Sequence, residues 1–294
     1  MQRGGIAFFD SGVGGLSVLR ECLKSIAGLP IYYYGDNARA PYGNRNIEEI
    51  RAYTHEAFSV FCRLGVSAVV VACNTVTALM IDELRATYPF PIVGIEPAIL
   101  PAARKGGKVL VLATRATAES ARLRRLIAVA ERRFSGAQIQ VVSCAHLAGE
   151  IERACQSDGL PHAFSLPRLS ADGVVLGCTH YSLIKRRIEQ FYGAEVFDGN
   201  EAVANRLREV VAGRGKEREN LGKNPPESVH FSLPQKSLRA LLFFARKRRK
   251  KHRRFSLKKQ ACFWKVKNAQ SLYFLGSGRV FNRQFYERMF AFEQ

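Results

Sequence analysis

Short apolar runs alternate with amphipathic helical stretches through roughly the first 200 residues. The apolar runs end at Gly, Asp or Cys, which is typical of buried strands. This alternation predicts parallel sheets in an α/β fold. The predicted strands are Ile6–Phe9, Ile31–Tyr34, Ala68–Val71, Ile92–Gly94, Val109–Leu112, Ile139–Val142, Gly173–Leu176, Glu195–Phe197 and Leu272–Leu275; the predicted helices are 15–26, 46–64, 75–87, Glu119–Phe134, Leu147–Cys155, Tyr181–Phe191, Ser237–Lys251 and Phe281–Phe290.

The strands and helices fall into two sets, which predicts two similar sheets. A weak internal repeat supports this division, because VVVACNT at 69–75 and GVVLGCTH at 173–180 share one pattern. Each is an apolar strand followed by Cys and then by hydroxyl or amide residues. The chain is expected to cross between the sheets near Pro97 and again at 198–199. From Gly213 to Pro226 the sequence is polar and contains Gly and Pro, so it predicts a loop.

The composition is that of a globular protein, with 47% apolar and 24% charged residues, and it excludes disorder of the whole chain. No signal-peptide pattern and no uninterrupted run of about 18 apolar residues occurs, so we expect no membrane span. The seven cysteines show no short repeated spacing, which indicates neither a zinc ribbon nor a disulfide framework. These features favour a cytoplasmic location.

Positive charge is concentrated in one segment. The net charge is +20, yet residues 214–270 hold 18 Lys/Arg against 3 Asp/Glu. The rest of the chain is therefore only weakly basic. A general affinity for nucleic acid, which the net charge alone would suggest, is not indicated outside this segment.

Two cysteines differ from the other five. Cys73 and Cys178 each follow a strand and precede a helix N-terminus, a setting that lowers a thiol pKa from ~8.5. A Cys/His nucleophile is one option. Matching positions in two similar sheets favour another device, with one thiol on each face of a substrate. The remaining cysteines, at positions 22, 62, 144, 155 and 262, are expected to be small buried apolar residues.

Two polar segments follow the first two strands. In the glycine-rich turn at 10–15, backbone N–H groups can bind an anion at a helix N-terminus. The dinucleotide pattern does not fit, because Ser17 takes the third glycine position and Asp10 lies inside the turn; the Walker A lysine is also missing. The turn therefore favours a small molecule with carboxylate or amine groups. The loop at 35–43 is read equally well as a substrate contact or as a simple turn.

Five motifs together resemble one family. They are FDSGVGG (9–15), YGDNARAPYG (34–43), VACNT (71–75), PIVGIEP (91–97) and LGCTH (176–180). In this order, over roughly residues 5–212, they resemble the glutamate racemases, a cofactor-independent branch of the Asp/Glu racemases. Residues 273–290 look like the family's last strand, turn and helix, with Arg279 where Asp is usual.

The resemblance implies specific roles. Cys73 would deprotonate D-glutamate with the help of Asp10, and Cys178 would deprotonate L-glutamate with the help of His180. Glu152 matches a further acidic position. No cofactor and no metal are implied. Packing alone remains the alternative for His180. The resemblance implies substrate contacts from Asp10, Ser11, Tyr42, Gly43, Asn74, Thr75, Thr117, Thr179 and His180.

The chemistry agrees with this interpretation. An amino-acid Cα–H is a very weak acid, so without pyridoxal phosphate the site must stabilise a carbanion electrostatically. Backbone N–H groups and hydroxyls can do so. A thiol with a pKa near ~8.5 can serve as acid or base close to neutral pH.

We therefore expect two pseudo-symmetric α/β domains, residues 1–96 plus 199–294 and residues 97–198, with the active site in the cleft between them. The expected activity is an isomerase supplying D-glutamate for peptidoglycan. An aspartate or related racemase of the same group is the nearest alternative. The family leaves a homodimer open.

The basic segment has no counterpart in the family pattern, because about 50 residues (220–270) intervene before the last strand. It is read as a solvated insertion, as a nucleic-acid-binding segment, as a packing element, or as an altered reading frame. Phe255, Phe263 and Trp264 lie among its Lys/Arg runs and could stack on bases. A nucleic-acid-binding protein on an inactive scaffold is thus the alternative from another class, although Asp10 and both cysteines are intact.

Overall fold

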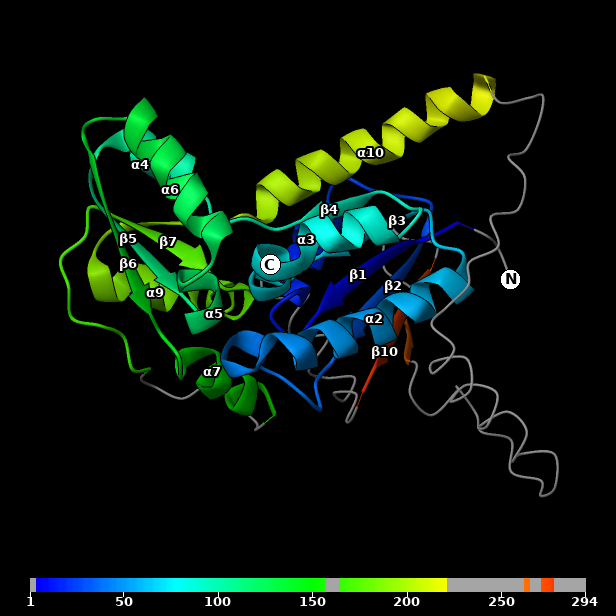
Figure 1. Cartoon of the computed structure of the whole chain (residues 1–294), viewed down its shortest axis with the longest axis horizontal. Coiled ribbons are helices and arrows are strands. Elements are labelled where there is room, and N and C mark those ends of the chain that lie inside the picture. The colour runs from blue at the N-terminus through cyan, green and yellow to red at the C-terminus, as the bar shows by residue number, and fades with distance from the viewer. Residues whose placement is uncertain (1–3, 157–163, 221–261, 265–270, 278–294) are drawn as a thin grey trace.

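The strands form two separate sheets, each covered by helices (Figure 1). The computed structural model describes residues 4–156, 164–220, 262–264 and 271–277. Both sheets are built from parallel strands, apart from one short antiparallel strand, so the predicted α/β class is confirmed.

The first sheet joins the beginning of the chain to its end. Its strand order is β4-β3-β1-β2-β10-β9. Strand β10 lies parallel to β2, whereas β9 pairs antiparallel to β10 and was not predicted. The strands are β1 (Ile6–Asp10), β2 (Pro30–Gly35), β3 (Ala68–Val71), β4 (Ile92–Gly94), β9 (Cys262–Trp264) and β10 (Ser271–Gly276).

The second sheet is contiguous in sequence and has the order β6-β5-β7-β8. All its pairings are parallel. Its strands are β5 (Gly107–Ala113), β6 (Ala137–Ser143), β7 (Gly173–Gly177) and β8 (Glu195–Phe197).

The helices predicted between residues 15 and 191 are present with shifted bounds. The observed helices are α1 (Leu16–Leu23), η1 (Tyr42–Asn44), α2 (Ile47–Leu64), α3 (Asn74–Thr87), α4 (Ile99–Lys105), α5 (Arg115–Ala118), α6 (Ala121–Arg133), α7 (Leu147–Gln156), α8 (Thr179–Ser182), α9 (Lys185–Tyr192) and α10 (Asn200–Asn220). Of these, η1, α4, α5 and α10 had no predicted range.

Three predicted elements were wrong in part. The loop expected from Gly213 is helical as far as Asn220, because an exposed glycine weakens a helix without ending it. The single helix expected at Tyr181–Phe191 is two short helices, since the backbone leaves the helical conformation at Ile184. The helix expected from Glu119 begins later, because Ser120 caps α6 by accepting the N–H of Leu123. The remainder of the expected loop and the helices expected at Ser237–Lys251 and Phe281–Phe290 lie outside the described residues.

Each sheet has an apolar core on both faces, as expected for parallel strands. In β1, Ile6 and Phe8 belong to one core cluster of the first sheet, whereas Ala7 and Phe9 belong to the other. The second sheet has a corresponding pair of clusters. No helix within the described part of the chain is long and apolar enough to cross a membrane.

This topology brings the predicted site residues to one edge of each sheet. Parallel strands β1, β2 and β3 end side by side, so the residues that follow them lie at the same edge. Strands β5 and β7 do the same in the second sheet. Ligands of open α/β sheets bind at this edge, so the candidate site lies in the segments that follow these strands.

Candidate active site

The carboxyl edges of the two sheets contact each other through buried hydroxyls and a carboxylate. Thr75 Oγ1, at the start of α3, lies 3.1 Å from Thr114 Oγ1, which follows β5. Thr179 Oγ1 in α8 donates to Asp10 Oδ1 at 3.2 Å. All four side chains are buried. The two matching strand ends of the sequence therefore meet in space.

Cys73 is the N-cap of α3 and is almost fully buried. Its thiol donates to Ser11 Oγ at 3.7 Å. Burial, followed by the charge of Asp10, raises the pKa of Cys73 to about 12, even though the Val76 N–H lowers it. The expectation that a helix N-terminus would lower the pKa of this thiol was therefore wrong, because loss of hydration outweighs the helix.

Cys178 takes the equivalent place at the N-cap of α8. Its Sγ lies 3.8 Å from His180 Nδ1, and the two thiols are close enough for the charge of Cys178 to raise the pKa of Cys73. The opposite ring nitrogen, His180 Nε2, lies 2.6 Å from Glu152 Oε2. Although burial disfavours the charged ring, its contacts with Cys178 and Glu152 raise the pKa of His180 well above its usual value.

Glu152, in α7, links this cluster to the glycine-rich turn. Its Oε2 accepts the Val13 N–H at 3.2 Å as well as contacting His180. Within the described residues, its Oε1 and both amide atoms of Asn74 are buried and lack a hydrogen-bond partner. Buried polar groups normally have partners, so these three atoms are suited to bind a polar ligand.

Asp10 is fully buried at the end of β1. Burial raises its pKa, against the lowering effects of His180 and of the Gly12 and Gly15 N–H groups. Its Oδ2 accepts the Gly12 N–H at 2.9 Å. The backbone N–H groups of Gly12 and Val13 in this turn therefore bind carboxylates of the protein itself, those of Asp10 and Glu152.

The glycines of the turn allow the second sheet to approach. A Cβ on Gly12 would lie 2.4 Å from Glu152 Oε2, and a Cβ on Gly14 would lie 2.5 Å from the His180 backbone N. Any side chain at these positions would collide with the groups around Cys178. Close approach of the two sheets is the physical reason for both glycines.

The loop after β2 forms a further bridge between the sheets. Tyr42 is fully buried, and its ring packs near Phe9. Gly43 lies against the Thr114 side chain, where an added Cβ would come within 2.6 Å of Thr114 Cβ. Asn44 Nδ2 donates to the Ala145 carbonyl at 2.8 Å. The loop is therefore held against the second sheet.

Every residue that the sequence singled out around the two thiols lies at this junction, the place where the carboxyl edges of the two sheets meet. Thr117 joins it through its Oγ1, which accepts a hydrogen bond from Thr114 Oγ1 at 3.0 Å. Sequence reasoning missed Thr114 and Asp36. Each directly follows an observed strand, β2 for Asp36 and β5 for Thr114, and lies two residues after the strand predicted there. A polar residue close to a strand end was the available signal. Their importance depends on contacts between distant segments, which the sequence does not display.

Four further cysteines, Cys22, Cys62, Cys144 and Cys155, are free thiols. Cys22 and Cys144 are buried as expected. Cys155 is only partly buried and Cys62 is exposed on α2, so the expectation of burial was wrong for Cys62 and held only in part for Cys155. Among the residues that the structure describes, no group of three or more His, Cys, Asp or Glu side chains is arranged to hold a metal ion.

Comparisons with known proteins agree on one family. The family model of Asp/Glu/Hydantoin racemase matches residues 11–207. The glutamate racemase of Clostridium botulinum (strain Okra / Type B1) is 35% identical over 224 residues, covering 73% of this chain and 86% of that protein. The glutamate racemase of Clostridium kluyveri is 36% identical over 219 residues, covering 69% and 82% of the two chains.

Solved structures give the same result. A crystal structure of Escherichia coli glutamate racemase, in complex with L-glutamate and the activator UDP-MurNAc-Ala, is similar with a TM-score of 0.62 and 27% identity. The match covers 83% of this chain and 95% of that chain. A glutamate racemase isoform from Bacillus anthracis has a TM-score of 0.58 and 28% identity, with coverage of 73% and 84%.

Proposed function

The chain belongs to the Asp/Glu/Hydantoin racemase family, and from this premise we propose that it interconverts L- and D-glutamate by proton transfer between Cys73 and Cys178. One observation carries the proposal. Two buried thiols, each at a helix N-terminus and each from a different sheet, lie close enough for the charge of one to raise the pKa of the other. A substrate held between two facing sheets would present one face of its Cα to each thiol.

The proposed step moves one proton in and one proton out. The Cys73 thiolate takes the Cα proton of D-glutamate, and the bond electrons stay on the substrate as a carbanion. The Cys178 thiol then gives its proton to the opposite face, which yields L-glutamate and a Cys178 thiolate. The reverse reaction uses the same groups with their roles exchanged.

Different neighbours serve the two thiols. The high pKa of Cys73 means that the free enzyme holds it protonated, so this thiol needs a proton acceptor before it can act as a base. The raised pKa of Asp10 makes this nearby carboxylate suited to that role. On the other side, the positive ring of His180, held by Glu152, attracts the negative charge that develops on Cys178.

Substrate binding is proposed to use the buried polar groups around the thiols. The free amide of Asn74 and the free Oε1 of Glu152 offer both donors and an acceptor. An acceptor suits the substrate ammonium group, and the amide suits a carboxylate. The other proposed contacts are Asp10, Ser11, Tyr42, Gly43, Thr75, Thr117, Thr179 and His180, which lie around the same junction.

The wider role is proposed on the same premise. D-glutamate made by this reaction would supply peptidoglycan synthesis. The division into residues 1–96 with 199–294 and residues 97–198 stays a prediction, supported by the strand membership of the two sheets.

Incubation with L-glutamate in heavy water tests the proposal. Circular dichroism is expected to decay to the racemic value while NMR detects deuterium at Cα. Cys73→Ser and Cys178→Ser should each lower turnover about 1,000-fold, because a serine hydroxyl is a much weaker acid than a thiol. Cys62→Ser, which changes an exposed cysteine, is the matched control and should keep full activity.

Two outcomes would oppose the proposal. Normal turnover in either Cys73→Ser or Cys178→Ser would exclude the two-thiol route. Faster turnover of D-aspartate than of D-glutamate by the unaltered protein would move the assignment to the aspartate branch.

A further inference from the structure

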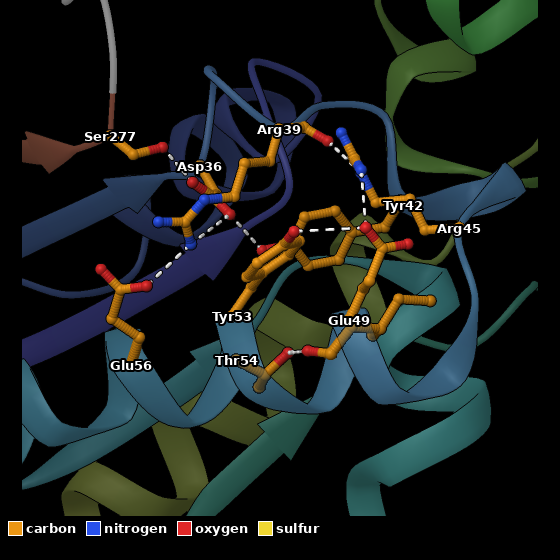
Figure 2. Close-up of polar contacts among 10 residues, drawn as sticks. Asp36, Arg39, Tyr42, Arg45, Glu49, Tyr53, Thr54, Glu56 and Ser277 are labelled. Carbon is orange, nitrogen blue, oxygen red and sulfur yellow. Dashed lines mark hydrogen bonds and ion pairs between the residues drawn. The ribbon is translucent and has the colours of Figure 1, made fainter. Parts of the chain in front are cut away.

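A buried carboxylate outside the proposed proton-transfer groups organises the loop after β2. Asp36 is fully buried, and its oxygens receive hydrogen bonds from three side chains (Figure 2). Tyr42 and Ser277 donate their hydroxyls, and Arg39 donates from Nη1 at 3.4 Å. A buried charge is costly unless it is surrounded in this way, so the three donors and the carboxylate form one unit.

Ser277 brings the far end of the chain into this unit. It directly follows β10, which pairs with β2 up to Gly276 opposite Gly35. Besides the side-chain bond to Asp36, the Ser277 carbonyl accepts the Ala38 N–H at 3.1 Å. Ser277 thus holds the loop at two points, the Asp36 side chain and the Ala38 backbone N–H, although it lies 241 positions after Asp36 in the chain.

Tyr42 carries the constraint toward the candidate active site. Burial and the charge of Asp36 raise the pKa of its hydroxyl, so it stays a donor. The next residue, Gly43, packs on Thr114, whose hydroxyl bonds to Thr75 beside Cys73. A set of contacts therefore leads from Ser277 through Asp36, Tyr42 and Gly43 to Thr114 and Thr75, two residues after Cys73.

Arg39 closes the outer side of the unit. Its Nη1 lies 2.8 Å from Glu56 in α2, and its guanidinium lies 4.2 Å from the centre of the Tyr53 ring. These contacts fix Arg39 on helix α2 while it neutralises Asp36 (Figure 2). The carboxylate is thereby anchored to β2, β10 and α2 together.

We propose that Asp36 and Ser277 act as a clasp that positions the Tyr42–Gly43 loop for substrate, which makes both positioning residues of the reaction. This inference rests on the proposed function. Neither side chain takes or gives the substrate proton. The clasp sets the distance between the loop and Thr114, and it makes the C-terminal strand necessary for correct substrate binding.

The expected kinetic effect of loosening the clasp is on binding. Ser277→Ala removes one donor from Asp36 and leaves the proton-transfer groups unchanged. We expect KM to rise about tenfold for both enantiomers of glutamate, with kcat changed less than about twofold. Ser277→Thr keeps the hydroxyl and should restore the original KM.

Ser67→Ala is the matched control. Ser67 is also half-buried, and its hydroxyl also bonds across the first sheet, to the Gly5 carbonyl at 3.1 Å, but it lies at the opposite edge of that sheet. This variant should keep the original KM and kcat.

Hydrogen exchange of the full chain gives a readout that does not need activity. In Ser277→Ala, amides of residues 36–45 should exchange at least about fivefold faster, while those of α2 beyond Glu56 stay as in the unaltered protein. Unchanged exchange in 36–45 together with a KM equal to that of Ser67→Ala would overturn the clasp. Faster exchange in a protein that does not racemise glutamate would support the clasp and reject the proposed function.

Discussion

Position 14 has no room for a side chain because His180, 166 positions later in the chain, packs against it. The Gly14 Cα faces the backbone N of His180 and the hydroxyl of Thr179, so a methyl group there would overlap both. The backbone N at 2.5 Å cannot move without shifting the start of α8. Cys178 is the N-cap of that helix, and the glycine therefore helps to set the position of a proposed catalytic thiol.

Gly14→Ala is expected to reduce both stability and activity. Overpacking of this kind costs about 1–3 kcal/mol of unfolding free energy, and we expect kcat/KM to fall about 100-fold because Cys178 is displaced. Gly213→Ala is the control, since nothing lies within 4 Å of a Cβ at that exposed position of α10. It should leave activity unchanged and raise stability by about 0.5–1 kcal/mol. Thermal unfolding measures the stability of each variant, and initial rates measure its activity.

Equal stability and activity in the two glycine variants would contradict this account. It would mean that the turn and α8 can separate without consequence for Cys178.

The sequence singled out individual candidate residues but not the partners that they contact. Cys73 and Cys178 could be singled out because each follows an apolar strand and precedes a helix, a local pattern. The contacts of Glu152 with the Val13 N–H and of Thr75 with Thr114 depend on how two sheets face each other. No spacing within either segment encodes that arrangement, so it emerges only from the fold.

At the scale of elements, the N-terminus of α3 competes with burial for control of a thiol. The helix contributes the Val76 N–H, which lowers the pKa of Cys73, but burial and Asp10 raise it to about 12. A thiol reacts with alkylating agents as its thiolate.

Alkylation of Cys73 by iodoacetamide should therefore accelerate about tenfold for each pH unit between pH 8 and 10, since the thiolate fraction grows in that proportion below the pKa. Mass spectrometry of the labelled peptide measures the rate. Far-UV circular dichroism of the intact protein at each pH verifies that it stays folded. A rate that levels off near pH 9 would show that the helix N-terminus outweighs burial.

The elements themselves were largely predictable because buried parallel strands read as short apolar runs. Two of the exceptions have local causes. Helix α4 was missed because Pro101 lies in it, yet proline is tolerated in a first turn, where the N–H has no helical partner. Strand β9 is only three residues long and pairs with β10 alone, so its sequence carries no clear period.

At the scale of the molecule, Arg122 ties the two sheets together at their crossing. It extends from α6, beside the second sheet, to Glu96 at 2.6 Å and to Asp82 of α3 at 3.4 Å. Glu96 lies in the first crossing segment, and its carbonyl packs on Gly199 of the second, where a Cβ would come within 2.3 Å. The junction is thus braced at the point where the chain passes between sheets.

Arg122→Ala should loosen this brace. Partly exposed ion pairs contribute little, so we expect a loss of about 1 kcal/mol in stability. The effect on kcat/KM should be larger, about tenfold, because Cys73 and Cys178 belong to different sheets. Arg206→Ala, which breaks an exposed pair with Glu209 inside α10, is the control and should change neither quantity. An unchanged kcat/KM in Arg122→Ala would show that the other contacts between the sheets suffice.

The pairing of β10 with β2 also has a consequence for the order in which the protein is made. All strands of the second sheet leave the ribosome before β10 does, so that sheet can be complete while the first still lacks its C-terminal strands. At 5–20 residues per second, β2 waits roughly 12–50 seconds for its neighbour. Throughout that interval the edge of β2 that later pairs with β10 has no partner strand. A chain whose synthesis stops within this interval is therefore prone to aggregate through that edge.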